Sequence, residues 1–421
     1  MREIFNKNGY WAQWVLAGLA LVALPFVFSS GASLTMMSLM GFAIIFSLSY
    51  NMLLGQTGIL SFGHAVYYGM GGFMTAHALN VVGAGKLPIP LPLIPLVGGL
   101  AGLSFAFIFG WVSTKRAGTA FSMISLGIGE LVAACSLILR SFFGGEGGVS
   151  TSRTSTLNFF GINFGPQIQV YYLIAAWCLL CMAAMYFFTR TPLGRMCNAV
   201  RDNPERTEFV GYNTQMVRFI AFCASGFFAG VAGGLSAIHY EIVTSSVIGA
   251  GPSGYVLLMS YIGGVGFFIG PIIGAVLMTA LQISLSDYTG AWMLYVGLMF
   301  VMVVMFAPGG LAGLLLMHKP MVISGTLSRL LPAYGLAVLP VSMVSVGGVL
   351  VVETCYHLLV KASEGTAMHV WWLHYDAKSP WAWTGILSVL MLGALALRKV
   401  SPRVAEAFHD AQQLAMRKGS K

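Results

Sequence analysis

Residues 33–75 read SLTMMSLMGFAIIFSLSYNMLLGQTGILSFGHAVYYGMGGFMT, and this stretch decides the class of fold. It contains no Asp, Glu, Lys or Arg, and its apolar runs are as long as the roughly 20 residues that a helix needs to cross a bilayer. The runs are continuous, without the alternating polar residues that line the lumen of a transmembrane β-barrel. The stretch therefore predicts membrane-spanning α-helices.

The rest of the chain has the same character. Of 421 residues, 57% are hydrophobic, 8% are charged and 52 are glycine, and the mean hydropathy is +0.82. A soluble globular protein carries about 25% charged residues. We therefore predict an all-α polytopic membrane protein with about 12 crossings. They are expected near residues 11–29, 33–54, 57–79, 90–112, 118–139, 169–189, 215–239, 245–266, 268–287, 291–307, 333–355 and 380–398.

The distribution of positive charge predicts the orientation. Basic residues accumulate in the cytoplasmic loops of membrane proteins. If both termini are cytoplasmic, most of the 22 Lys and Arg residues lie on the cytoplasmic side. The five on the outer side are then Lys86, Arg140, Arg153, Lys361 and Lys378. The net charge of +9 is thus explained by topology and by attraction to anionic lipid, and no nucleic-acid partner is expected. The first run resembles a signal peptide, but its removal would break this parity, so we expect it to remain as a helix.

Two glycine-rich interruptions predict the translocation path. They occur in comparable positions of residues 33–112 and 215–287, a weak inverted repeat, and paired broken segments mark substrate paths in transporters. The path candidates are Gly55, Gln56, Thr57, Gly58, Ser61, His64, Glu130, Gly263, Gly264 and Gly266. Hydrogen bonds that repair the broken backbone are an equally good interpretation of Gln56 and Ser61. A neutral, hydrogen-bonded side chain is the safer interpretation of His64, and a structural partner on a neighbouring helix is slightly favoured for Glu130.

Residues 190–214, RTPLGRMCNAVRDNPERTEFVGYNT, form a charged loop in an otherwise apolar chain. They predict two short helices with a break at 202–204: Asn203 can cap the second helix, Pro204 suits its first position and Gly211 suits its end. The local pattern is equally compatible with a solvated loop whose charge serves topology and with a surface that a soluble partner grips. The residues of interest are Arg195, Arg201, Asp202, Asn203, Pro204, Glu205, Arg206, Glu208 and Gly211.

Repeated small residues predict close helix packing. Glycines recur at four-residue spacing at positions 226, 230 and 234, and again at positions 98 and 102. Cys178 and Cys181 form a C-x-x-C pattern inside a predicted span, where small packing residues are the expected interpretation.

Several stretches occur together in one order: LLGQTGILSFGHAVYYGMGGF (53–73), LGIGELV (126–132), GGEGGV (144–149), TPLGRMCNAVRDNPERTEFVGYNTQMVRFIAF (191–222) and MFAPGGLAGLL (305–315). Together they resemble the permease subunit of leucine/isoleucine/valine-type ABC importers over about residues 33–316. The resemblance implies a second, homologous permease, two cytoplasmic ATPase subunits and an extracytoplasmic binding protein. It also implies that 191–214 is the segment that the ATPase engages, in a bacterial inner-membrane importer of branched-chain or other hydrophobic amino acids; urea or short amides are alternative substrates.

Residues 320–421 depart from that pattern. We expect a permease domain over 1–319 and a C-terminal extension over 320–421 with two transmembrane helices and a basic tail. The spacings of the acidic and histidine residues of the extension match no recognised metal site, and its tryptophans favour an interfacial belt. These residues are Glu353, His357, Glu364, His369, His374 and Asp376, with Trp371, Trp372, Trp381 and Trp383.

Catalysis finds no support in the sequence. A P-loop needs G-x-x-x-x-G-K followed by Ser or Thr, and around Lys86 the first glycine is replaced by Asn80 and the hydroxyl residue by Leu87. No cofactor or metal is expected, and ATP hydrolysis is assigned to partner subunits. The alternative is an ion-coupled secondary transporter of small amino-acid-like or amide solutes, for which paired intramembrane carboxylates are expected. A channel is a weaker alternative, because no repeated filter sequence is present.

Overall fold

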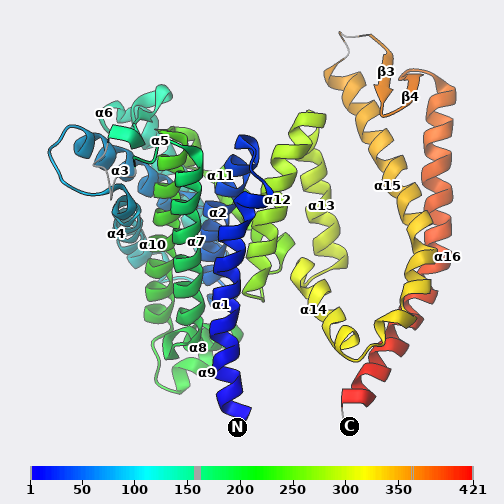
Figure 1. The fold of residues 1–421 in the computed structure, drawn as a ribbon, viewed down its shortest axis with the longest axis horizontal. Helices are drawn as coiled ribbons and strands as arrows, with labels where there is room; N and C mark the ends of the chain where they lie inside the picture. Colours follow the sequence, from blue (N-terminus) through cyan, green and yellow to red (C-terminus); the bar gives the residue numbers. More distant parts are fainter. Residues whose placement is uncertain (1, 156–162, 362, 364, 420–421) are drawn as a thin grey trace. The chain divides into compact units, whose positions relative to one another are not determined.

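The computed structural model describes residues 2–155, 163–361, 363 and 365–419, and, within these ranges, the side chains of residues 12–417. Glu364 and Lys421 lie outside these residues. The described chain is almost entirely helical, which confirms the all-α prediction (Figure 1). It divides into two compact units, described separately here: Met1–Leu285 with Leu298–Gly313, and Ser286–Gly297 with Leu314–Lys421. The predicted domain boundary between residues 319 and 320 stays a prediction.

The first unit is a helical bundle with one short sheet. Its longer helices are α1 (Arg2–Val27), α2 (Gly31–Asn51), α3 (Ala65–Gly83), α4 (Ile94–Ser113), α5 (Thr119–Ile138), α7 (Gln167–Arg190), α10 (Thr214–Tyr240), α11 (Ala250–Gly263) and α12 (Ile269–Tyr288). Shorter pieces are the π-helix η1 (Met52–Thr57), α6 (Arg140–Phe143), α8 (Pro192–Asp202), α9 (Pro204–Phe209) and the single turns η2 (Leu91–Leu93), η3 (Gly145–Gly147), η4 (Arg153–Ser155) and η5 (Ser245–Val247). Strands β1 (Val149–Ser150) and β2 (Ile242–Val243) pair antiparallel, with Val149 opposite Val243.

The core of this unit is built around α10, which packs on α2, α3 and α4. Glycines bring the backbones together: a methyl group at Gly102 would lie 2.8 Å from the Cα atom of Gly230. A methyl group at Gly98 would lie 2.7 Å from the Gly230 carbonyl oxygen. The predicted packing of the glycine repeats is thus confirmed, and it explains why these positions hold no larger side chain.

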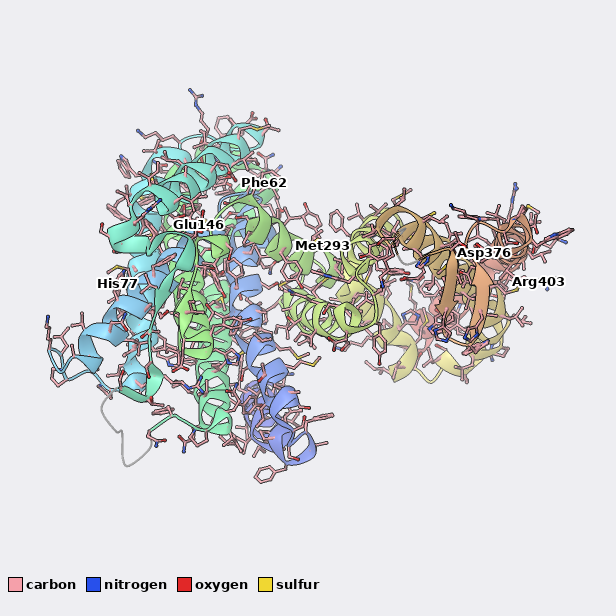
Figure 2. The ribbon with its side chains drawn as sticks, turned by 90° about the horizontal axis from the view of Figure 1, so that it is seen from above. Phe62, His77, Glu146, Met293, Asp376 and Arg403 are labelled. Carbon is pink, nitrogen blue, oxygen red and sulfur yellow. The ribbon has the colours of Figure 1, made fainter. Side chains whose placement is uncertain are left out.

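The outward surfaces of the helices are apolar. Viewed from above, side chains made mostly of carbon cover them (Figure 2). On α4, for example, Leu100, Phe107 and Ile108 are each more than half exposed. Lipid is the solvent that tolerates such a surface, because apolar side chains gain little by being buried when the surroundings are equally apolar.

Eight helices are long and apolar enough to cross a membrane, and α13 (Trp292–Phe306) with α14 (Gly310–Ile323), bent by 46°, forms a ninth candidate span among the described residues. Three expected crossings fall on helices outside this set: α11 and the apolar part of α1 are shorter, and α3 is long enough but less apolar. The 57–79 crossing begins later than expected, since residues 58–64 are irregular and α3 starts at Ala65. A polytopic membrane protein is confirmed, whereas the number of crossings stays a prediction.

The second unit contains α15 (Leu331–Val360) packed antiparallel on α16 (Pro380–Gly419), with the single turn η6 (Leu327–Arg329) before them. A hairpin of β3 (Ala367–Val370) and β4 (Leu373–Asp376) joins the two helices (Figure 1). Two features differ from expectation: this hairpin, and the helical residues 318–323 where a loop was expected. The expected spans at 333–355 and 380–398 lie within α15 and α16.

Candidate functional site: a broken helix and a charged segment

The helix that begins as α2 does not end in an ordinary cap. It widens into the π-helix Met52–Thr57 and stops at Gly58, whose φ of 70° is left-handed. A π-helix inside a longer helix often marks a functional position, because it inserts an extra residue into the hydrogen-bond ladder. Ile59, Ser61, Gly63 and His64 follow in irregular yet buried backbone. The predicted interruption therefore exists, and it is an abrupt break.

Serines from two other helices satisfy the backbone of this break. Ser122 Oγ donates to the Leu60 carbonyl at 2.8 Å, and Ser125 Oγ accepts from the Phe62 N–H at 3.0 Å, both from α5. From α11, Ser253 Oγ accepts from the Ala65 N–H at 3.0 Å. Irregular backbone at membrane depth persists only where such partners replace the helical ones. These three serines were not identified from the sequence.

Four polar side-chain atoms around the break have no hydrogen-bond partner among the described residues. They are Asn51 Oδ1, Gln56 Oε1, Ser61 Oγ and His64 Nδ1. Ser61 and His64 are fully buried, and Asn51 and Gln56 are less than 10% exposed. One interpretation of Gln56 and Ser61 was that they repair the broken backbone. Among the described residues, neither Gln56 Oε1 nor Ser61 Oγ forms a hydrogen bond to the backbone. An unpartnered buried polar atom is costly, so these four atoms are candidates for contact with water or with a polar solute.

His64 is held between aromatic rings and a serine. Its Nε2 lies 3.0 Å from Ser49 Oγ of α2, and its ring stacks on Phe46 with centroids 5.4 Å apart. The expected hydrogen bond to a neighbouring helix is thus present. Thr57 lies next to the break, but its side chain bonds within its own helix: Oγ1 donates to the Leu53 carbonyl at 2.6 Å.

Glu130 and the second glycine segment lie in different surroundings. The exposed side chain of Glu130 accepts a hydrogen bond at Oε1 from the Ala250 N–H, at the start of α11. Gly263 and Gly264 are buried in close backbone contacts: a methyl group at Gly263 would lie 2.9 Å from the Gly274 nitrogen, and one at Gly264 would lie 3.3 Å from the Gly309 carbonyl carbon. Gly266 is exposed, and a methyl group there would contact nothing within 4 Å. None of these residues hydrogen-bonds to residues 51–64 in the described part of the chain.

Residues 191–214 form the two predicted helices, α8 and α9. Thr191 Oγ1 accepts from the Gly194 N–H at 3.2 Å and caps α8, while Asn203 Oδ1 accepts from the Arg206 N–H at 2.8 Å and caps α9. Pro204 begins α9, Glu205 lies in its first turn, and Gly211 has a φ of 95°. The cap, the proline and the glycine therefore act as predicted, because each works through its local backbone.

One face of α8 packs on the membrane domain and the other carries charge. Cys197 and Val200 are buried against Val217 and Ala221 of α10. Burial raises the pKa of the Cys197 thiol to about 12, so it stays protonated near neutral pH. The charged residues Arg195, Asp202, Glu205, Arg206 and Glu208 are exposed, and Glu208 Oε1 also accepts a hydrogen bond from Thr214 Oγ1 at 2.6 Å.

Arg201 joins this segment to the broken helix. Its Nη1 donates to the carbonyl of Gly55, and its Nε and Nη2 each lie 3.0 Å from Asp202 Oδ1. A methyl group at Gly58 would lie 2.9 Å from Arg201 Cγ. Two regions that the sequence suggested separately, the path candidates and the charged segment, thus meet at one arginine.

An apolar patch lies beside the charges of α9. Phe209 is 91% exposed and Val210 is 70% exposed, and Tyr212 is also exposed. The sequence prediction named only the charged residues of this loop and missed these three. The signal was the run FVGY in an otherwise polar segment, since large exposed aromatic residues mark protein interfaces.

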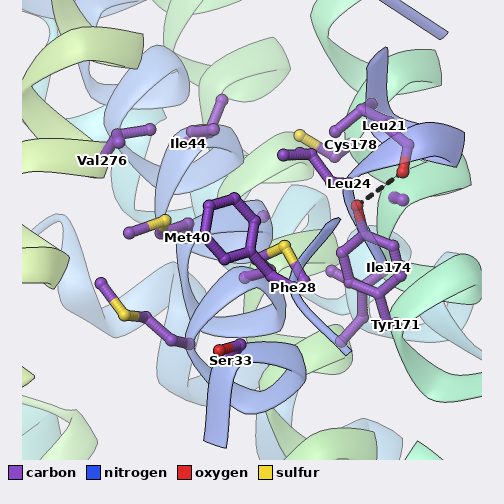
Figure 3. Close-up of a pocket in the computed structure, with 14 residues that line it drawn as sticks. Leu21, Leu24, Phe28, Ser33, Met40, Ile44, Tyr171, Ile174, Cys178 and Val276 are labelled. Carbon is purple, nitrogen blue, oxygen red and sulfur yellow. Dashed lines mark hydrogen bonds between the residues drawn. The ribbon is translucent and has the colours of Figure 1, made fainter. Parts of the chain in front are cut away.

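A separate cavity of about 440 Å³ lies among α1, α2, α7 and α12 (Figure 3). Apolar side chains, among them leucine, isoleucine and methionine, line most of it. The Tyr171 hydroxyl, at its wall, already donates to the Leu21 carbonyl at 2.7 Å. The cavity offers few polar atoms, and it is therefore a poor site for the charged ends of an amino acid.

The acidic and histidine side chains of the extension have structural contacts. Glu353 Oε1 accepts from the Tyr295 hydroxyl at 2.8 Å, and His357 Nε2 lies 3.0 Å from the Gly365 carbonyl. His369 and His374 face each other across the β3–β4 hairpin. Within the described residues, no three His, Cys, Asp or Glu side chains gather closely enough to hold a metal ion. Trp371, Trp372 and Trp381 are exposed, whereas Trp383 is partly buried and donates to the Ala377 carbonyl at 2.9 Å.

Comparisons with known proteins identify the family of this chain. The family model described as "Branched-chain amino acid transport system / permease component" matches residues 32–308. High-affinity branched-chain amino acid transport system permease proteins LivM of Salmonella typhimurium and Escherichia coli are each 28% identical to this chain, over 69% of it and 72% of their own length. A probable branched-chain amino acid transport permease LivM of Methanocaldococcus jannaschii is 24% identical over 64% of this chain and 90% of its own. No solved structure shows a significant match. The match to the family model covers both the broken helix and the α8–α9 segment, and this chain belongs to the family of permease components of branched-chain amino acid transport systems.

Proposed function

We propose that this chain is the membrane-spanning subunit of an ATP-driven importer for branched-chain or other hydrophobic amino acids. It forms the translocation path with a second, homologous permease, couples to two cytoplasmic ATPase subunits and receives substrate from an extracytoplasmic binding protein. Family membership supports the permease role. The α8–α9 segment carries the coupling part of the proposal.

The exposed surface of α9 has the composition of a docking site. Phe209, Val210 and Tyr212 supply exposed apolar area, and the same α8–α9 segment carries the exposed charges of Arg195, Glu205 and Arg206. Interfaces of this kind combine an apolar centre with a polar rim. The buried face of α8 on α10 ties the segment to the bundle, so a force applied at α9 acts on the helices behind it.

The path is proposed at the break after α2. Gln56 and Ser61 offer unpartnered polar atoms in an apolar bundle, which suits a small zwitterion better than a sugar or a phosphate. The path also includes four further candidates, Glu130, Gly263, Gly264 and Gly266. Capping of α11 also explains the contact of Glu130, and close helix packing also explains the contacts of Gly263 and Gly264.

The orientation follows from the same proposal. The α8–α9 segment must face the cytoplasm to meet an ATPase, which agrees with cytoplasmic termini and the positive-inside pattern. The alternative, an ion-coupled secondary transporter, needs titratable groups along the path. Glu130, the carboxylate expected for that role, instead accepts a hydrogen bond from the first turn of α11.

The experiment is reconstitution of the chain with its proposed partners in lipid vesicles. We expect substrate-loaded binding protein to stimulate ATP hydrolysis and leucine uptake. Phe209→Ala and Glu205→Lys should each weaken ATPase binding about tenfold or more while the permease stays folded, because central apolar contacts and rim charges set docking. An exposed arginine between α4 and α5, changed as Arg116→Gln, serves as the matched control. Uptake driven by an ion gradient without ATP would refute the proposal.

A further inference from the structure

Arg201 contacts the broken helix with both its head and its stem. The guanidinium donates to the Gly55 carbonyl, and the Cγ atom lies where a side chain at Gly58 would be. Asp202 holds the guanidinium from the other side through two contacts of 3.0 Å. The planar fork of arginine suits this bridging position, because it presents several donors in fixed directions.

The Gly55 carbonyl needs such a donor. It lies in the last turn of the π-helix, where carbonyls have no N–H ahead of them in the same helix. The N–H groups of Gly58 and Ile59 both turn back to Leu53, so they do not reach Gly55. Arg201 thus supplies from α8 the hydrogen bond that the helix itself lacks, as basic side chains do at helix ends.

The two sides of the break are held differently. On the side of α5 and α11, serines fix residues 60–65 through neutral hydrogen bonds. On the side of α8, the attachment is a charged one, from Arg201 to the Gly55 carbonyl. Between these attachments lie Gln56 and Ser61, whose buried polar atoms have no partner. A shift of α8 therefore acts on the end of the π-helix through Arg201 while the serine attachments remain.

We propose that Arg201 is a positioning residue that transmits movement of the α8–α9 segment to the π-helix, and so sets the exposure of Gln56 and Ser61 to the path. This inference rests on the proposed coupling to an ATPase. It differs from a docking role, because Arg201 then acts inward, on Gly55, and not on the partner. Loss of Arg201 should therefore leave ATPase binding intact but abolish the change at the broken helix that follows ATPase binding.

The test uses the full complex in lipid vesicles with a cysteine in place of Ser61. The rate of modification by a water-soluble thiol reagent is measured without nucleotide and with a non-hydrolysable ATP analogue. The chain with native Ser61 is treated in parallel to subtract the native cysteines. In the chain that keeps Arg201, we expect the modification rates with and without nucleotide to differ by about fivefold or more, which is a usual magnitude of coupling between two sites.

Arg201→Gln should bring that ratio close to 1 and reduce substrate-stimulated hydrolysis, with ATPase affinity unchanged within about twofold. Arg201→Lys keeps one donor and should restore part of the nucleotide response. Asp202→Asn, which leaves the Gly55 contact in place, should have a smaller effect and serves as a second variant if Arg201→Gln does not fold. Arg116→Gln, outside the segment, should behave as the unsubstituted chain.

Two results would overturn the inference. One is a normal nucleotide response in Arg201→Gln; the other is loss of ATPase binding in Arg201→Gln that fully accounts for lost transport. The proposed function fails separately, if Phe209→Ala and Glu205→Lys both leave ATPase binding and uptake intact.

Discussion

Glu130 of α5 accepts a hydrogen bond from the backbone N–H of Ala250, 120 residues later in the chain, at 3.2 Å. Ala250 is the first residue of α11, where helix N–H groups lack intrahelical acceptors and the dipole favours a negative charge. Gly249, the residue before the helix, has no side chain to supply a cap. The carboxylate of another helix therefore takes that role.

This relationship predicts unequal effects of two substitutions. Glu130→Ala removes the acceptor and should lower the stability of the solubilised protein by about 1 kcal/mol, whereas Glu130→Gln keeps an acceptor oxygen and should cost only a few tenths. Thermal unfolding of both variants in detergent checks the difference. If Glu130→Gln unfolds normally yet abolishes uptake, the carboxylate acts in transport and not only as a cap.

The cap of α9 gives a second prediction. Asn203→Ala leaves the Arg206 N–H without its acceptor and should loosen α9 by about 1 kcal/mol, while Asn203→Asp retains a strong cap. Amide hydrogen exchange at Arg206 and Thr207 reports the change directly. Exchange that is equal in both variants would mean that the helix is held by other contacts.

Two glycines of the second segment, Gly264 and Gly266, should respond differently to the same methyl group. Gly264 has a φ of 117° and lies against Gly309, so Gly264→Ala should destabilise the fold by about 1–3 kcal/mol. Gly266 has open space around it, and Gly266→Ala should stay within about 0.5 kcal/mol of the parent chain. Melting temperatures of the two purified variants compare them. Equal stability would show that the Gly264–Gly309 approach is not tight.

Features encoded by neighbouring residues were predictable from the sequence. Asn203, Pro204 and Gly211 define α9 through local backbone geometry, and the long apolar runs specify helices wherever they occur. The hairpin β3–β4 was missed because its turn contains Trp371 and Trp372, not the Asn-Gly type of residue that marks two-residue turns. The span predicted at 291–307 corresponds to α13, whereas α14, which begins at Gly310, was not predicted.

Contacts between distant residues were not predictable in the same way. The donor to Gly55 comes from Arg201, 146 residues away, and the serines that hold the break come from α5 and α11. Any of several polar residues could have served, and only the packing of the helices selects among them. The sequence located the broken segment, but not the side chains that hold it in place.

The unpartnered atoms at the break predict access to water. A buried polar side-chain oxygen without a partner costs about 1–3 kcal/mol, so the Gln56 amide and the Ser61 hydroxyl should be solvated during part of the transport cycle. Cysteines at these positions should react with a small water-soluble maleimide in at least one nucleotide state. Leu53→Cys, from the same π-helix and fully buried, is the matched control and should stay unreactive. Reaction rates at 56 and 61 as low as at 53 in every state would assign the break to packing alone.

The last prediction concerns the extension over 320–421, which we infer to be a peripheral two-helix addition. Many of its contacts are internal: a methyl group at Gly393 would lie 2.8 Å from Met343 Cβ, and Met321, Leu330, Ala411 and Ala415 form one apolar cluster. One contact differs, since Glu353 accepts from Tyr295 of α13, which lies within the residues that the family model matches.

Deletion of residues 320–421 should therefore preserve assembly and leucine uptake but lower stability by about 1–2 kcal/mol, the upper range for a polar contact between membrane helices. Tyr295→Phe and Glu353→Gln in the full chain isolate that contact, and their double mutant should cost no more than the larger single effect. Thermal unfolding and uptake of all four proteins separate a stabilising role from a functional one. A truncated permease that assembles with its partners but transports nothing would place the extension in the transport mechanism, because lost stability alone lowers the amount of folded complex and leaves the turnover of each complex unchanged.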